Sequence, residues 1–147
     1  MPNRTQLTEG EIAFVLSQRV AHLATADASG SPHVIPVCYA FDGTRFYTPL
    51  DEKPKRVAGN KLRRVRNIEA RHEASLVIDR YDDEDWSQLG YILIYGRADL
   101  LPPEDERHAH IVELLRERYL QYRSMALEKY ALIMITPERI SLWGSVF

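Results

Sequence analysis

The stretch HVIPVCYAFDGTRFYTPL, residues 33–50, decides the fold class of this chain. Valine, isoleucine, tyrosine and phenylalanine are frequent in both of its halves, and Asp42-Gly43 between them is a strong signal for a hairpin turn. The pattern predicts a first strand over 33–41 and a returning strand over 44–50. Because Pro36 has no amide hydrogen to give to a ladder, we expect the first strand to bend.

The residues before this hairpin predict a short helix and one more strand. Thr8 and Glu11 are three residues apart and form the capping-box pattern that begins a helix. The apolar residues expected on its inner face are Ile12, Val15 and Leu16, with Phe14 offset from them. A strand over 20–27 and a turn over 28–31 follow.

The residues after the hairpin predict two more helices and four more strands. The helices are expected over 56–70, with Val57, Lys61, Arg64 and Ile68 on one face, and after Pro103, with an inner stripe of Ile111, Leu114, Leu115, Arg118 and Tyr119. The strands are expected over 73–81, 87–101, 130–136 and 139–143, with Gly96 at a bulge.

These elements define a fold class. About six or seven strands with three or four helices, which begin with hairpins and do not alternate as strand and helix, predict an α+β fold: a small antiparallel barrel with peripheral helices. The length of 147 residues fits one domain, 1–147, with its own hydrophobic core. The single cysteine excludes an internal disulfide, and no apolar run approaches the roughly 18 residues of a membrane helix. We therefore expect a cytoplasmic protein without a membrane partner.

Positive charge is concentrated directly after the hairpin. Eight of the 19 Lys and Arg residues lie between residues 53 and 71, where Glu69 is the single acid, although the whole chain has a formal charge of −2. They are Lys53, Lys55, Arg56, Lys61, Arg63, Arg64, Arg66 and Arg71. A solvated helix face and a nucleic-acid surface are two interpretations, and the acidic balance of the chain argues against the second. Because the run leaves the end of a hairpin, where barrels hold ligands, capture of a phosphate is the favoured interpretation.

Other kinds of site have weaker support. The sequence has no GxGxxG, P-loop or HExxH pattern. The acidic run 82–85 lacks the spacing of a calcium loop, so we interpret it as a turn. His108 and His110 point to different sides of a helix and make a poor metal pair. Cys38 has no evident acid-base partner and is interpreted as a structural thiol. No metal site is expected.

Several short segments occur in a distinctive order along the chain. They are VAHLATAD (20–27), GSPHVIPV (30–37), FYT (46–48), KPK (53–55), RVRNI (64–68), ASLVID (74–79), DWS (85–87) and GRA (96–98). In order and spacing they resemble the flavin-binding split β-barrel proteins related to pyridoxamine 5′-phosphate oxidase. Within this group they are most similar to the actinobacterial deazaflavin-dependent oxidoreductases. The resemblance extends from about Thr8 to Trp143.

The resemblance implies an antiparallel split β-barrel with peripheral helices that forms a homodimer with two cofactor sites at the interface. A flavin-like ring would lie against the barrel, with its phosphate held by basic side chains. The nearly continuous apolar run from Tyr91 to Tyr95 is a candidate for the dimer contact.

Carried over by position, the resemblance assigns cofactor-binding residues. Arg64 stands for the motif's lysine and Arg66 for its arginine. The remaining candidates are His33 and Pro36 on the strand that faces the ring or substrate, Thr48, Pro49 and Leu50 along the ring, Trp86 near the pocket of its own or the partner subunit, and Lys53, Lys55 and Lys61, which compete for the phosphate. Pro49 removes a backbone donor that could otherwise reach the cofactor.

The implied function is that of an oxidoreductase that uses a reduced deazaflavin coenzyme to transfer hydride to an unidentified small organic substrate. No catalytic residue is assigned, and His33 and Tyr47 are candidate proton donors. An FMN-binding oxidase or reductase of the same fold is the nearest alternative. A non-enzymatic protein that binds a flavin, haem or another tetrapyrrole is a second, and a nucleic-acid binder is a third.

Overall fold

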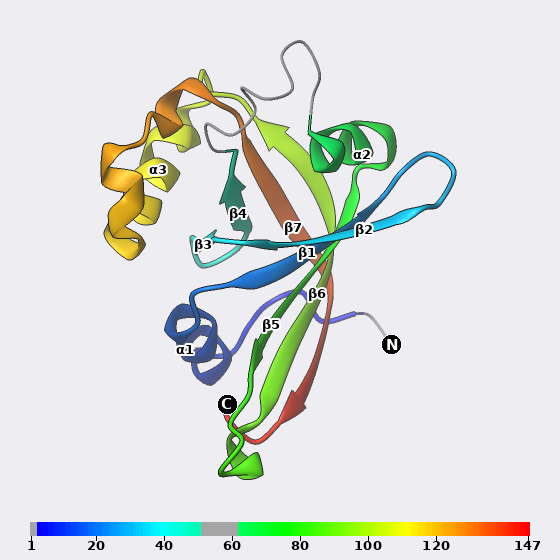
Figure 1. Ribbon diagram of the computed structural model, residues 1–147, viewed down its shortest axis with the longest axis vertical. Helices are drawn as coiled ribbons and strands as arrows, with labels where there is room; N and C mark the ends of the chain where they lie inside the picture. The colour runs from blue at the N-terminus through cyan, green and yellow to red at the C-terminus, as the bar shows by residue number, and fades with distance from the viewer. Residues whose placement is uncertain (1–2, 51–61) are drawn as a thin grey trace.

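A curled antiparallel sheet of seven strands organises the parts of the chain that the structure, a computed structural model, describes, residues 3–50 and 62–147 (Figure 1). The strands lie in the order β2-β1-β5-β6-β7-β4-β3. Their bounds are β1 Ala21–Ala26, β2 Pro32–Val37, β3 Ala40–Phe41, β4 Phe46–Pro49, β5 Glu73–Arg80, β6 Gly90–Leu101 and β7 Leu132–Gly144. The expected antiparallel split barrel is confirmed.

Helices surround this half-barrel. The α-helices are α1 Glu9–Ser17, α2 Arg63–Arg71 and α3 Glu106–Arg118, and the short 3-10 helices are η2 Trp86–Gln88, η3 Leu120–Ser124 and η4 Leu127–Lys129. In the view of Figure 1, α2 and α3 lie near the upper end and the turn that carries η2 lies at the lower end. No helix within 3–50 and 62–147 has the length and apolar character needed to cross a membrane.

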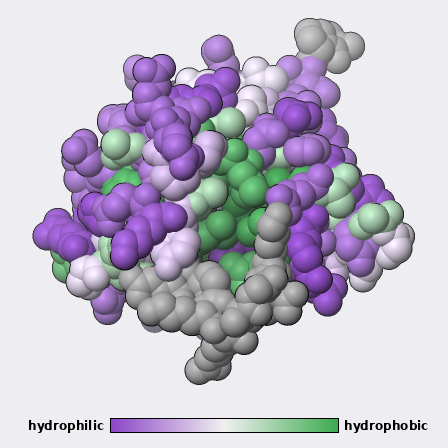
Figure 2. Space-filling model, turned by 90° about the horizontal axis from the view of Figure 1, so that it is seen from above, coloured by the Kyte–Doolittle hydropathy of each residue, from purple (hydrophilic) through white to green (hydrophobic). Residues whose placement is uncertain are grey.

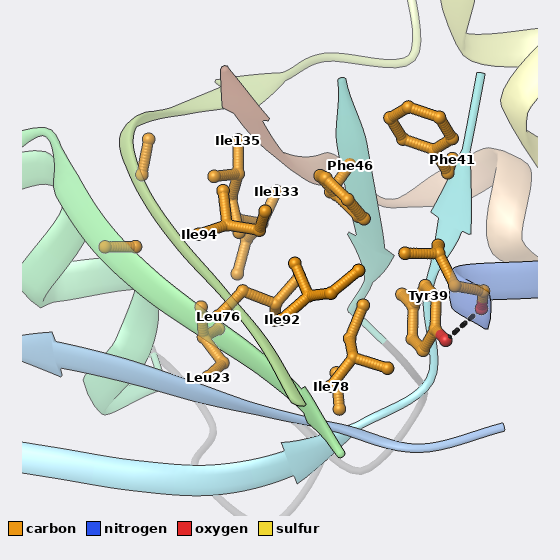
Figure 3. Packing of buried hydrophobic residues seen from close by; sticks show 14 of the residues in the cluster. Leu23, Tyr39, Phe41, Phe46, Leu76, Ile78, Ile92, Ile94, Ile133 and Ile135 are labelled. Carbon is orange, nitrogen blue, oxygen red and sulfur yellow. Dashed lines mark hydrogen bonds between the residues drawn. The ribbon is translucent and has the colours of Figure 1, made fainter. Parts of the chain in front are cut away.

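The predicted hairpin forms, but its first half is two strands rather than one. β2 ends at Val37 and the short β3 starts at Ala40. Between them the buried Tyr39 turns its phenol to the backbone of α1 and donates to the carbonyl of Val15 (Figure 3). At the expected turn, Gly43 has a φ of 102°, a conformation that favours glycine.

The core fills the inside of the curl (Figure 3). Alternate residues of the neighbouring strands point inward, so the sheet contributes one apolar face. The largest of these fully buried residues are Leu23, Phe46, Leu76, Ile78, Ile92 and Ile94. Of the expected interface run, Ile92 and Ile94 therefore belong to the core, and Tyr91, Leu93 and Tyr95 alternate onto the outer face.

The capping box that begins α1 is confirmed, because the Glu11 amide donates to the Thr8 hydroxyl and the Thr8 amide donates to the Glu11 carboxylate. The expected inner face was wrong in part. Phe14 is buried, with its ring edge-on to that of Phe147 at 5.0 Å, whereas Leu16 is 46% exposed. The helix turns Glu11, Phe14 and Val15 inward, so the buried stripe is shifted from the one predicted.

Helix α3 begins later than expected, at Glu106, and Asp105 caps it by accepting from the Arg107 amide. Its buried stripe contains Ile111 and Leu115, as expected, together with His108 and Val112, which the sequence pattern did not single out.

Arg118, expected on the inner stripe of this helix, connects three elements through hydrogen bonds. Its guanidinium donates to the carbonyls of Leu16, Gln18 and Tyr39 at 3.1, 2.8 and 3.0 Å. It therefore joins the end of α3 to the end of α1 and to the residue before β3.

The two expected closing strands are one strand, β7, which continues across Pro137. Gly96 of β6 pairs with Pro137 and Tyr95 pairs with Arg139, so the register shifts by one residue at this point. The bulge expected at Gly96 is confirmed. It also explains why Pro137, which cannot donate to a ladder, does not end the strand.

Helix α2 begins later than the sequence predicts. Leu62 has an extended backbone and is the N-cap, so the helix starts at Arg63 rather than near Arg56. The expected positions from Arg56 to Lys61 lie outside the described residues. The helix buries Val65, Asn67 and Ile68, so Ile68 of the expected face is buried as predicted, whereas Arg64 is half-buried and Val65 and Asn67 were not expected there.

Candidate cofactor site

A recess with a volume of about 350 Å³ lies where β2 and β4 end, beside the first turn of α2. Its walls come from two strands, a helix start and η3. The lining residues are Ile35, Pro36, Val37, Cys38, Thr48, Pro49, Leu62, Arg64 and Tyr122. Figure 2 looks down on the end of the molecule that carries α2, where hydrophobic side chains gather near the centre and hydrophilic ones surround them.

The recess brings together four of the residues predicted for the cofactor. Pro36 comes from β2, Thr48 and Pro49 come from the end of β4, and Arg64 comes from the first turn of α2. Thr48 and Pro49 are held in place because β4 pairs with β7 through Thr48–Ile133 and Pro49–Leu132. Residues from Pro36 to Arg64, up to 28 positions apart in the chain, thus share one concave surface with a guanidinium among its lining groups.

Packing of α2 on the sheet determines where Arg64 lies. Val65 and Ile68 are buried toward the sheet, and the side-chain amide of the buried Asn67 donates to the hydroxyl of Thr25 in β1 at 3.0 Å. The charged side chains of the helix, such as Arg63 and Arg66, lie on its exposed side. Asn67 was part of a recognised motif, but its role as the anchor of α2 was not predicted.

The start of α2 has the electrostatics of an anion site. The amides of Val65 and Arg66 donate to the carbonyl of Leu62, so these are the first intrahelical hydrogen bonds. Leu62 has a hydrocarbon side chain that cannot cap the amides before them. The positive end of the helix dipole and the charge of Arg64 therefore act at this recess, and Arg63 adds positive charge from the neighbouring recess.

His33 lies on β2 next to this positive charge. It is half-buried, and its Nδ1 atom is buried with no hydrogen-bond partner among residues 3–50 and 62–147. Burial lowers the pKa of His33, and the neighbouring charges of Arg63 and Arg64 lower it further. The imidazole is therefore neutral near neutral pH.

Tyr47, the other candidate proton donor, does not line the recess. Strand alternation places Thr48 in the recess and turns Tyr47 to the opposite side, toward the second core cluster with α3. Its phenol donates to the Asp42 carboxylate at 2.8 Å. Burial, followed by this hydrogen bond, raises the pKa of Tyr47. Tyr47 therefore lies away from this recess, and its candidacy as a proton donor stays a prediction.

The remaining candidates are dispersed. Arg66 lines a separate recess of about 320 Å³ with Arg63 and Asn67, because positions 64 and 66 point to different sides of a helix. Leu50 is half-buried against the main core. Trp86 is 69% exposed on η2, at the end of the molecule opposite to α2 (Figure 1). Lys53, Lys55 and Lys61 lie outside the described residues.

Sequence reasoning missed other lining residues, among them Cys38 and Tyr122. Cys38 was interpreted only as a structural thiol, although it follows the strand that forms the wall. Tyr122 comes from a segment more than eighty residues away, and no local pattern connects it with β2.

The acidic turn and the histidines of α3 have local structural partners. The carboxylate of Asp82 accepts from the amides of Glu84 and Asp85, and Nε2 of His108 lies 2.8 Å from the carbonyl oxygen of Tyr130. In the described part of the chain, no three His, Cys, Asp or Glu side chains are grouped as a metal would require.

A curled antiparallel half-barrel with a basic recess at one end defines this chain as a split β-barrel protein. The sequence pattern of the pyridoxamine 5′-phosphate oxidase family matches residues 7–144, and the chain belongs to this family.

Individual relatives have different reported roles. A 5a,11a-dehydrotetracycline/5a,11a-dehydrooxytetracycline reductase of Streptomyces rimosus is 26% identical over 138 residues, which are 93% of this chain and 82% of the reductase. Among solved structures, the haem storage protein HutZ of Vibrio cholerae has a TM-score of 0.70 at 19% identity, over 92% of this chain and 93% of HutZ. An FAD-binding protein of Mesorhizobium loti has a TM-score of 0.67 at 22% identity, over 97% of both chains.

Proposed function

We propose that this protein is an oxidoreductase that binds a deazaflavin coenzyme in the recess and reduces a small organic substrate. The observation that carries the proposal is the convergence of Arg64 and the start of α2 on a recess bounded by Pro36 and Thr48. Membership of the pyridoxamine 5′-phosphate oxidase family and the similarity to a reductase support the same reading. FMN is the alternative cofactor.

The residues of the recess fit such a cofactor. A flavin or deazaflavin combines a planar, largely apolar ring with an anionic phosphate. The recess offers Ile35, Pro36 and Val37 as an apolar wall and a guanidinium with a helix start as the donor set for an anion. When bound, a deazaflavin supplies the hydride chemistry.

The protein's own residues have binding and protective tasks in this proposal. Arg64 holds the phosphate through charge-assisted hydrogen bonds, and the apolar wall excludes water from the ring face. The neutral His33 is a candidate to deliver or accept a proton: it lies near the start of β2, outside the residues that line the recess, and its Nδ1 atom is buried beside Arg63 and Arg64.

A homodimer is part of the proposal. A volume of about 350 Å³ is at the lower end of the range for small-molecule sites, about 300–1,000 Å³, so one chain would enclose only part of the cofactor. The outer face of the sheet carries Tyr91 stacked on Trp143 with ring centroids 6.2 Å apart. Trp143 is 54% exposed, as expected of a surface that a partner covers.

The proposal is tested by titrating the purified protein with the deazaflavin coenzyme and with FMN, followed by fluorescence. Tight binding of the deazaflavin, together with oxidation of its reduced form in a screen of organic acceptors, is the expected result. Preference for FMN would move the protein to the flavin alternative. Stoichiometric binding without turnover of any acceptor would identify a binding module, and binding of neither would reject the cofactor site.

A further inference from the structure

The segment that joins α3 to β7, residues 119–131, forms one wall of the recess, and we call it the strap. It contains η3 and η4 and brings Tyr122 to the recess, where Cys38 and Arg64 lie in other walls. The backbone hydrogen bonds inside the strap close only short local turns, such as the Met125 amide to the Tyr122 carbonyl, so the position of Tyr122 relative to the recess depends on contacts with other elements.

Arg116, in the last turn of α3, supplies the contacts that hold the strap. Its Nε donates to the carbonyl of Tyr122 at 3.1 Å, and its Nη2 donates to the carbonyl of Met125 at 2.8 Å. The same Nη2 forms an ion pair with Glu128 at 2.8 Å. One rigid guanidinium thus fixes three points of the strap, which a flexible ammonium could do only in part.

A second aromatic ring, that of Tyr119, also packs against Tyr122. The two rings meet edge-on with centroids 5.5 Å apart. The Tyr119 hydroxyl donates to the carbonyl of Arg19 at 2.8 Å and accepts from the Tyr39 amide at 3.1 Å. Tyr122 therefore packs against Tyr119, which is itself hydrogen-bonded to Arg19 and Tyr39.

We infer that Arg116 is a positioning residue, which holds Tyr122 as the wall that sets the width of the recess and so the size of the ring it admits. The inference rests on the proposed function for the identity of the ligand, but the position of the wall does not depend on that identity. An aromatic ring with a polar edge is suited to cover the face of a planar ligand.

Cys38 provides a readout that needs no cofactor. It is the single cysteine of the chain and lies in the recess wall, so the rate of its alkylation by a maleimide reports how open the recess is. Arg116→Ala, which removes charge-assisted bonds to the strap, and Tyr122→Ala, which removes the wall itself, are each expected to raise this rate about tenfold or more. Arg116→Lys is expected to recover part of the wild-type rate. Arg107→Ala, on the same helix but paired with Asp105, is the control and keeps the wild-type rate.

The same variants are then titrated with the deazaflavin coenzyme and with FMN. Weaker binding by Arg116→Ala, with partial rescue by Arg116→Lys, is expected. Wild-type alkylation and binding in Arg116→Ala would overturn the inference and leave the proposed function intact. If neither wild type nor any variant binds either cofactor, but the alkylation rates of the variants still differ from wild type as expected, the role of Arg116 is confirmed and the proposed function fails. If Arg116→Ala does not fold, unchanged alkylation of Tyr122→Ala would overturn the inference.

Discussion

The side-chain amide of Asn67 donates a 3.0 Å hydrogen bond to the hydroxyl of Thr25, inside the contact between α2 and β1. Both residues are buried, so water cannot replace either partner. The bond fixes the rotation of α2 about its own axis. Together with the burial of Val65 and Ile68, it places Arg64, and not Arg66, at the recess.

Removing this amide should destabilise the protein. Asn67→Ala leaves the Thr25 hydroxyl buried without its donor, and we expect the free energy of unfolding to fall by about 1–3 kcal/mol, as measured by urea denaturation. Replacing both partners, as Asn67→Leu with Thr25→Val, should recover part of this loss. An Asn67→Ala protein with wild-type stability would show that the bond does not anchor the helix.

The bulge at Gly96 should not accept a side chain. A Cβ atom at this position would lie 2.6 Å from the carbonyl oxygen of Thr136 and 2.8 Å from Cγ2 of Ile135. Because the first obstacle is backbone, β6 and β7 would have to separate. We expect Gly96→Ala to cost about 1–3 kcal/mol in thermal or urea unfolding. Gly43→Ala meets no atom within 4 Å but is strained by its φ of 102°, so it tests backbone conformation and not steric contact; wild-type stability of Gly96→Ala would contradict the steric account.

His33 should make stability depend on pH. Its pKa is lowered in the folded protein, mainly by burial and then by Arg63 and Arg64, so the unfolded chain binds more protons over the affected range. The contribution of His33 to the free energy of unfolding is fully present above the ordinary histidine pKa of about 6.5. It is lost as the pH drops through that value toward the lowered pKa of the folded protein. Denaturation midpoints measured between neutral and mildly acidic pH should show this slope.

His33→Gln is the matched variant, because it keeps a polar side chain and removes the titration. It should flatten the slope in this range while other groups still destabilise the protein at lower pH. An equal slope in the variant would assign the pH dependence to another residue.

The strands were predicted better from the sequence than the site. Alternating apolar residues, the Asp42-Gly43 turn and the bulge at Gly96 are local patterns, and the structure confirms each of them. A bend in the first strand was expected from Pro36, but its position at Tyr39 could not be predicted, because Tyr39 is hydrogen-bonded to α1, twenty-four residues away. Burial of Phe14 in place of Leu16 likewise depends on which neighbours the helix meets.

Arg64 was predicted through its motif and joins Pro36, Thr48 and Pro49, as expected. Arg66 and Trp86 belonged to equally recognisable motifs but lie elsewhere, since motif order does not say which way a helix turns. Tyr122 had no local pattern at all, because it reaches the recess through the Arg116 contacts with the strap. Local sequence thus predicts elements, whereas the composition of a site depends on long-range packing.

The most direct test of the central claim, that Arg64 holds the cofactor's anion, is a fluorescence titration of wild type, Arg64→Ala and Arg66→Ala with the deazaflavin coenzyme and FMN. Loss of a charge-assisted bond predicts that Arg64→Ala weakens binding of the preferred cofactor by about 1.5–3 kcal/mol. Arg66→Ala removes the same charge from the other side of α2 and should lose clearly less. Equal losses in both variants, or wild-type affinity in Arg64→Ala, would contradict the account.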